Sequence, residues 1–329
     1  MKPAGVVGLG AVGSRVARQL TASGSHLVVF DPDPAALAGL GSSPNLVSLT
    51  DGNVRDEVAD VVVVATPTPQ APVAIALLRR GLHVITTTDD PDDVHELLGH
   101  DSEVSRLGRC LVVGAAASPG MTGLMVSELR HRFDDIDEIH VAFHGTGGPA
   151  CARQHHRALG GEAIGWHDGE WIERPGGSGR ELFWFPEPIG GKDCYRAELA
   201  DPIVLHRAFP SVKRISARVS ATRRDRLTAR LPMMSPPHPE GGLGGLRVEV
   251  RGSLGGARVT HVAGIAERTA VIAGALAAAV ADQLQGGVTS GNIPTGVVVV
   301  GDGQLDELAL MTAVIQRGIT VFEYIGAAG

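Results

Sequence analysis

From residue 4 to residue 114, short apolar runs alternate with stretches of helical periodicity. The clearest run is Asp60–Ala65, in which four consecutive valines predict a strand that is buried on both faces of a parallel sheet. Further strands are predicted at 4–8, 26–31, 45–49, 82–86 and 110–114, and helices at 12–23, 34–40, 70–80 and 92–107. This spacing of strands and helices predicts βαβ units wound around one sheet.

The pattern changes after about residue 133. Strands are predicted at 136–143, 212–221 and 246–262, and helices from about Pro149 and over 266–284. Residues 166–188, rich in Gly, Pro and aromatic side chains, are predicted as loop or hairpin, and 234–245 as a mobile loop. The tail after Pro294 is predicted as strand, helix and strand.

The turn between the first predicted strand and helix reads Gly8-Leu9-Gly10-Ala11-Val12-Gly13, a Gly-x-Gly-x-x-Gly pattern. Gly8 permits a tight turn, Gly10 lets the backbone approach a pyrophosphate, and Gly13 allows the helix to pack closely on the sheet. The N–H groups at the start of the helix can bind phosphate. In this strand–turn–helix context, the pattern predicts a dinucleotide site that includes Ala11 and Val12.

Asp31 ends the second predicted strand, where a carboxylate accepts hydrogen bonds from the hydroxyls of the adenosine ribose. It would repel a 2′-phosphate, so NAD is predicted as the cofactor in preference to NADP. A simpler role for Asp31 as a helix cap stays open. The turns after the fourth and fifth strands are also predicted to face the cofactor, through Thr66, Pro67, Thr68, Thr88 and Asp89. The alternative is that these residues only form ordinary turns.

These patterns predict an α/β protein of two domains. The length of 329 residues also suggests two domains, because a domain typically has ~150 residues. Residues 1–132 should form a Rossmann domain with a parallel, doubly wound sheet. Residues 133–263 should form an α+β substrate or dimerisation domain with a mainly antiparallel sheet. A helix at about 264–285 should pack back on the first domain, followed by a C-terminal extension over 286–329.

Composition excludes several other classes of protein. A formal net charge of −7 without a long basic run argues against binding to nucleic acid or to an anionic membrane. The apolar stretch Thr269–Ala281 is shorter than the ~20 residues of a membrane span, and the first strand leaves no room for a signal peptide. Scattered Cys110, Cys151 and Cys194 indicate reduced thiols. We therefore expect a cytoplasmic protein without a metal site, and a homodimer as the commonest oligomer.

Several stretches resemble the saccharopine dehydrogenase-like reductases. The resemblance is carried by the glycine motif and by residues 60–67, 81–89 and 114–124. Residues 114–124 are similar to that family's Pro-Gly turn, which leads into a helix. The general layout of the family also fits residues 185–191, residues 248–252 and the Ala-rich helix. The resemblance implies hydride transfer to a C=N or C=O group of an amino-acid-derived substrate. It also implies that the second domain is inserted before a helix that returns to the first.

Two departures from related families bear on this expectation. Several members of the family prefer NADP, whereas Asp31 favours NAD. Sugar oxidoreductases of similar build carry Glu-Lys-Pro where this chain has Thr88-Asp89-Asp90-Pro91, without lysine. A fainter similarity links 145–148 and 155–157 to dihydrodipicolinate reductase.

Reduction of an imine or ketone needs a proton donor beside the hydride. His155 and His156 lie just inside the helix that begins near Pro149, and because neighbouring helical positions point about 100° apart, at most one faces a cleft. We predict His155 as one candidate and Lys192, in a Gly-Gly-Lys-Asp segment, as the other. Surface or packing roles would also explain both side chains.

Substrate carboxylates would be fixed by arginine side chains or by backbone N–H groups at a helix start. The predicted substrate-binding residues are Ser118, Gly120, Gly147, Gly148, Arg153, His156 and Arg196. The chain is thus predicted to be an NAD-dependent oxidoreductase acting on an amino-acid-derived or oxo-acid substrate. Two alternatives stay open: a sugar-type or redox-neutral enzyme with bound NAD, and a non-catalytic NAD-binding protein.

Overall fold

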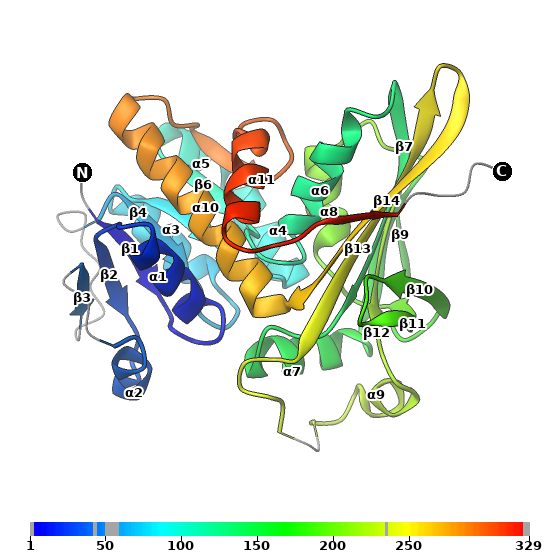
Figure 1. Ribbon diagram of the computed structural model, residues 1–329, viewed down its shortest axis with the longest axis horizontal. Coiled ribbons are helices and arrows are strands. Elements are labelled where there is room, and N and C mark those ends of the chain that lie inside the picture. Colours follow the sequence, from blue (N-terminus) through cyan, green and yellow to red (C-terminus); the bar gives the residue numbers. More distant parts are fainter. Residues whose placement is uncertain (1–2, 42–44, 50–58, 234–235, 325–329) are drawn as a thin grey trace.

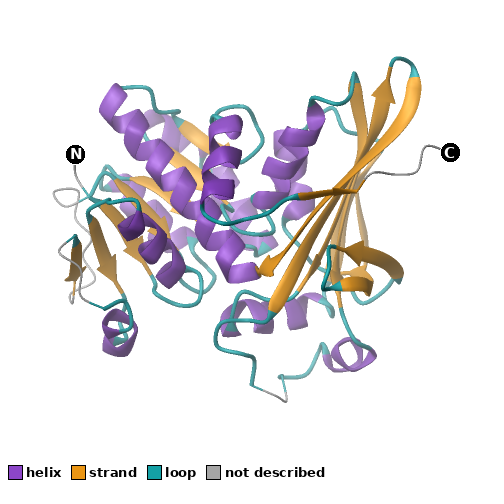
Figure 2. Ribbon diagram, in the orientation of Figure 1, coloured by secondary structure: helices purple, strands orange, loops and turns teal. Residues whose placement is uncertain are grey.

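The computed structural model describes residues 3–41, 45–49, 59–233 and 236–324, and it contains two sheets separated by a layer of helices (Figures 1 and 2). The first sheet lies toward the N-terminus, and the second forms the opposite side of the molecule (Figure 1). The predicted α/β class and the change of architecture after residue 133 are confirmed.

The first sheet has seven parallel strands in the order β15-β6-β5-β4-β1-β2-β3. Their bounds are β1 (Ala4–Val7), β2 (Leu27–Phe30), β3 (Leu46–Leu49), β4 (Val61–Val64), β5 (His83–Thr86), β6 (Cys110–Val113) and β15 (Gly296–Val299). All residues of β1, β4, β5 and β6 are buried, because helices cover both faces. The predicted parallel, doubly wound sheet is confirmed.

Two apolar layers cover this sheet. One contains α1 (Gly13–Ala22), α6 (Met121–Arg130) and α10 (Thr269–Ser290), and the other contains α3 (Ala71–Arg79), α4 (Pro91–Gly99) and α5 (Asp101–Arg106). The helix predicted over 92–107 is therefore two helices. Asp90 begins the first, because its side chain accepts from the backbone N–H groups of Asp92 and Asp93, and the two helices meet at His100.

The second sheet has nine strands and is mainly antiparallel, as predicted, except that β7 and β12 run parallel. Its strands are β7 (Asp135–His144), β8 (Glu162–His167), β9 (Glu170–Pro175), β10 (Glu181–Phe185), β11 (Gly190–Arg196), β12 (Arg214–Ser220), β13 (Leu243–Leu254), β14 (Ala257–Arg268) and β16 (Phe322–Tyr324). The predicted loop or hairpin over 166–188 contains β9 and β10. Of the predicted mobile loop, residues 234 and 235 lie outside the described residues.

Helices α6 and α8 (Asp201–Ala208) lie between the two sheets, and α7 (Pro149–Ala158) lies below the second (Figure 1). The remaining helices are α2 (Pro34–Ala38), α9 (Arg223–Thr228) and α11 (Glu307–Gln316). Apolar residues of both sheets join one core: Val63 of β4 and Phe143 of β7 belong to the same buried cluster. A continuous core of this kind fixes one domain against the other.

The segment from α10 to β16 connects the domains. Small side chains let α10 approach α1 closely, and an added Cβ on Gly274 would lie 2.8 Å from Cβ of Arg15. By length and composition α10 is the one described helix that could cross a membrane, but 67% of its most apolar window is buried inside the fold, as in a core helix. The segment predicted as a C-terminal extension contributes β15 to the first sheet and β16 to the second.

Candidate active site

A groove of about 570 Å³ lies beyond the carboxyl ends of β1, β2, β4 and β5. Nine of the predicted cofactor residues line it: Gly8, Gly10, Ala11, Val12, Asp31, Thr66, Pro67, Thr68 and Asp89. Thr88 is buried instead, with its hydroxyl 3.4 Å from the backbone N–H of Asp90, and the neighbouring Thr87 lines the groove. The glycine turn and the strand ends thus form one continuous surface.

The glycines of the turn have two different functions. A Cβ added to Gly10 would meet no described atom within 4 Å and would project into open space. A Cβ added to Gly13 would lie 1.8 Å from the carbonyl oxygen of Gly8, which itself has φ +89°. Gly10 therefore keeps the groove open, whereas Gly13 is required for the turn itself.

The Asp31 carboxylate is held at the edge of this groove. It accepts from the backbone N–H of Leu9 at 2.6 Å through Oδ2 and from that of Asp33 at 2.8 Å through Oδ1. The capping role belongs to Asp33, whose side chain accepts from the N–H of Ala35 at the start of α2. Each Asp31 oxygen keeps a lone pair for a hydroxyl group of a ligand.

The N-terminus of α7 forms the opposite wall. Gly148, with φ +129°, packs so closely on the glycine turn that an added Cβ would lie 2.7 Å from Cβ of Ala11. Gly147, Gly148 and Arg153, which were predicted to bind substrate, line this groove together with Arg157. The structure thus places these three residues beside the predicted cofactor residues.

A second hollow, of about 470 Å³, lies on the other side of α7, at the ends of β7 and β12. It brings together His155, His156 and Lys192, three of the predicted catalytic or substrate residues, and adds His144, which sequence reasoning missed. His144 Nδ1 lies 2.6 Å from the hydroxyl of Ser220. Burial and the charge of Lys192 lower the pKa of His144. The neutral imidazole that results suits hydrogen bonding to an uncharged group.

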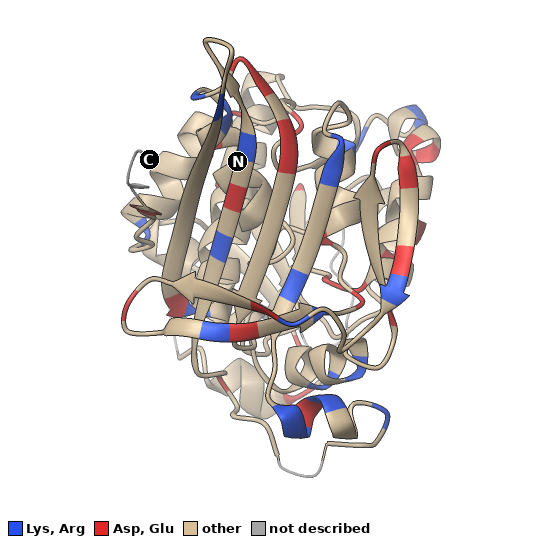
Figure 3. Cartoon of the chain, turned by 90° about the vertical axis from the view of Figure 1, so that its right-hand side faces the viewer, with Lys and Arg blue, Asp and Glu red and all other residues tan. Residues whose placement is uncertain are grey.

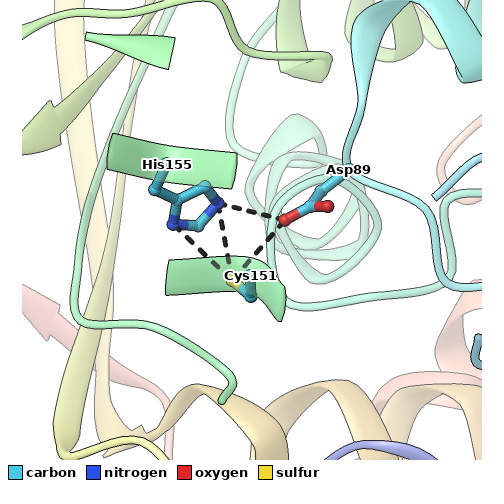
Figure 4. A group of neighbouring side chains, drawn as sticks. All are labelled: Asp89, Cys151 and His155. Atoms are coloured by element: carbon cyan, nitrogen blue, oxygen red, sulfur yellow. Dashed lines mark hydrogen bonds and ion pairs between the residues drawn. The ribbon is translucent and has the colours of Figure 1, made fainter. Parts of the chain in front are cut away.

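His155 lies between the groove and the hollow, paired with Asp89 (Figure 4). Its Nε2 is 3.0 Å from Oδ2 of Asp89, and only 9% of its side chain is exposed. Burial by itself would lower the pKa of His155, but the neighbouring Cys151 and Asp89 outweigh it and hold that pKa well above its usual value. These neighbours favour the protonated form of His155, which is the form that can donate a proton.

Cys151 completes this cluster and was missed by sequence reasoning. Its Sγ lies 3.6 Å from both ring nitrogens of His155 and 3.7 Å from Oδ2 of Asp89 (Figure 4). The signal that could have found it is the Cys151-x-x-x-His155 spacing, which places both side chains on one helix face. The three polar groups lie within 4.8 Å of one another, close enough to share a metal ion.

Three predicted substrate residues lie elsewhere. Ser118 is buried and donates to Oδ2 of Asp201 at 2.5 Å, while Thr122 donates to Oδ1 at 2.8 Å. Gly120, with φ +107°, fits a turn in which an added Cβ would lie 2.3 Å from the carbonyl oxygen of Gly114. These residues join the turn after β6 to α8. Burial raises the pKa of Asp201 to about 6.

Arg196 lies on the outer face of the second sheet, in a hollow of about 360 Å³ that also contains Arg174 and Arg218. Figure 3 shows this face, where the positions of basic and acidic residues are coloured along neighbouring strands. The hollow that contains His155 and Lys192 does not include Arg196 among its described lining residues.

Comparison with known proteins supports the fold. A family model described as the TrkA-N domain matches residues 4–105. No curated protein matches the chain. Among solved structures, an engineered D-amino acid dehydrogenase bound to NADP⁺ is 15% identical with a TM-score of 0.54, over 96% of this chain and 99% of that one.

Two further structures are similar over nearly their full length. A C. glutamicum DAP dehydrogenase in complex with DAP is 13% identical with a TM-score of 0.50, over 96% of this chain and 99% of that one. A putative myo-inositol dehydrogenase from Sinorhizobium meliloti 1021 is 14% identical with a TM-score of 0.50, over 98% and 99%. At these identities the likeness shows the fold alone: a Rossmann domain followed by a second sheet domain.

Proposed function

We propose that this chain is an NAD(P)-dependent oxidoreductase, with NAD preferred, that transfers hydride to or from a C=N or C=O group of an amino-acid-derived or oxo-acid substrate. The observation that carries the proposal is the Asp89–His155 pair. Asp89 lines the groove that fits a dinucleotide, and His155 lines the separate hollow beyond α7. A proton donor between a cofactor site and a substrate site is what hydride transfer to a carbonyl or imine requires.

The residues of the groove fit a dinucleotide along its whole length. Asp31 would bind the adenosine ribose, and Gly10 and the N-terminus of α1 the pyrophosphate. Arg153 and Arg157 would pair with the phosphates from the opposite wall. The nicotinamide, which accepts or supplies the hydride, would then lie toward Asp89. The NADP⁺ bound to the similar D-amino acid dehydrogenase supports a nicotinamide dinucleotide here.

The hollow has the chemistry of a site for a small polar substrate. Lys192 would fix a carboxylate, and His155 would donate its proton to the substrate heteroatom. The volume of about 470 Å³ suits a small metabolite. The resemblance to saccharopine dehydrogenase-like reductases supports an amino-acid-derived substrate. The cytoplasmic location and the homodimer stay predictions.

The experiment is a screen of amino acids, their oxo-acid partners and the corresponding aldehydes for NADH oxidation or formation by absorbance. We expect one of these compounds to turn over, and His155→Ala to lower its kcat/KM while NADH affinity stays unchanged. The matched control is His95→Ala, because His95 is exposed on α4 and lies outside both hollows. Full activity in His155→Ala, or equal losses in both variants, would contradict the proposal.

A further inference from the structure

Cys151 has the surroundings of a reactive cysteine. It is the third residue of α7, after the N-cap Gly148, so its sulfur lies where the helix dipole favours negative charge. The imidazolium of His155 is one turn further along, with both nitrogens 3.6 Å from Sγ. The Cys151 S–H donates to Oδ2 of Asp89 at 3.7 Å, and the same carboxylate oxygen lies 3.0 Å from Nε2 of His155. The N-terminus of α7 and the imidazole of His155 thus both lie beside the Cys151 sulfur, where they can activate it as a nucleophile.

Cys151 is also accessible, unlike the other two cysteines. It lines the groove that we assign to the dinucleotide, at the end toward Asp89. Cys110 and Cys194 are fully buried in strands, and burial raises the pKa of each thiol to about 12. The chain thus offers one partly exposed candidate nucleophile and two buried thiols for comparison.

We propose that Cys151 is a catalytic nucleophile and that the amino-acid-derived substrate is an aldehyde, which the enzyme oxidises to a carboxylate through a thioester. This inference rests on the proposed function, and it names the substrate class of the same site. The carbonyl carbon would lie between the cofactor groove and the hollow, where Cys151 and His155 meet.

The proposed reaction has three steps. The Cys151 thiolate forms a bond to the aldehyde carbon, and the oxygen takes the proton of the His155 imidazolium, which gives a thiohemiacetal. The carbon then loses its hydrogen with the electron pair to NAD⁺, and the hydroxyl proton returns to His155, which leaves a thioester. Water attacks the thioester, the thiolate leaves, and the acid ionises. In total, aldehyde, NAD⁺ and water give carboxylate, NADH and two protons.

The first test measures the reactivity of the thiol without any substrate. Iodoacetamide is added at pH 6.5 under native conditions, and alkylation of the three cysteines is followed by peptide mass spectrometry. Cys110 and Cys194 of the same protein are the internal controls. We expect Cys151 to react at least about tenfold faster than either, and His155→Ala to slow it. Equal rates at all three cysteines would overturn the proposal.

The second test asks whether the thiol forms an acyl intermediate. With 4-nitrophenyl acetate we expect a burst of nitrophenolate and an acetyl adduct on Cys151, lost in Cys151→Ala. A stoichiometric zinc ion held by Cys151, with alkylation only after chelation, would overturn the nucleophile and assign a metal site. NADH binding is measured on the same samples. Binding without acylation refutes only the nucleophile, whereas absence of binding refutes the proposed function.

Discussion

The two hollows that flank α7 are built in different ways. The cofactor groove is formed largely by short consecutive segments, such as Gly8–Val12 and Thr66–Thr68, which follow strands of one parallel sheet. The hollow that we propose for the substrate collects His144, His155 and Lys192 from three separate elements, β7, α7 and β11. The first therefore depends on local turn geometry, and the second depends on how distant elements pack. Substitutions should affect the two sites independently.

The largest effect is expected in the glycine turn. Gly10→Val should abolish dinucleotide binding and retain the fold, because its side chain enters the open groove, whereas Gly13→Val should prevent folding of the turn. Calorimetry with NADH and circular dichroism distinguish these outcomes. Gly99→Val is the control, since an added Cβ there meets no described atom within 4 Å and the residue lies at the end of α4. If Gly10→Val bound NADH as tightly as the wild type, the glycine turn would not be part of the dinucleotide site.

Substitutions in the hollow that contains His155 and Lys192 should lower activity without weakening NADH binding. His155→Ala and Lys192→Ala should each lower kcat/KM by at least about tenfold and leave NADH affinity unchanged. For comparison, a positioned general acid typically contributes a rate factor of ~10²–10⁴. The reason is that neither residue lines the part of the groove that fits the pyrophosphate. Steady-state kinetics and NADH titration check this. A parallel loss of NADH affinity would show that the two hollows are not separate sites.

Asp201 should influence stability rather than cofactor or substrate binding. Its raised pKa, about 6 against 3.8, means that the folded state favours the protonated form. The resulting stabilisation is complete below pH 3.8 and is lost as pH rises through 6; the shift corresponds to about 3 kcal/mol. Urea unfolding between pH 4 and 7 should show this dependence in the wild type and not in Asp201→Asn. Identical pH slopes would contradict the assignment.

The smallest effect concerns cofactor choice. Replacing Asp31 by Ala and Pro32 by Arg removes the ribose contacts and replaces repulsion of a 2′-phosphate by attraction. We expect the NADH-to-NADPH preference to shift by about tenfold, or ~1.4 kcal/mol, toward NADPH. Fluorescence titration with both dinucleotides measures it. A wild type that already prefers NADPH tenfold would show that Asp31 does not select the cofactor.

The comparison also explains what could be predicted from sequence. The valine run of β4 and the glycine turn specify local structure directly, so the parallel sheet and most groove residues were identified. The short helices α8 and α9 were missed because their periodicity extends over too few residues. Cys151 was missed because its meaning depends on Asp89, which is 62 residues away in sequence.

Misplaced residues have similar physical causes. Arg196 was predicted to bind substrate because of its residue type, but it lies at the far end of β11 from Lys192 and lines the separate hollow on the outer face of the sheet. Ser118 was predicted from its position after β6, and its hydroxyl instead satisfies a buried carboxylate of α8. In both cases the direction of a side chain is set by tertiary packing, which the local sequence does not encode.

The most direct test of the central claim is a crystal structure of the chain with NADH bound. The measurement is the distance from Nε2 of His155 to C4 of the nicotinamide. The account predicts that this distance is no more than about 6 Å, within reach of a proton relay through one water molecule. A distance beyond about 10 Å would exclude such a relay and contradict the account.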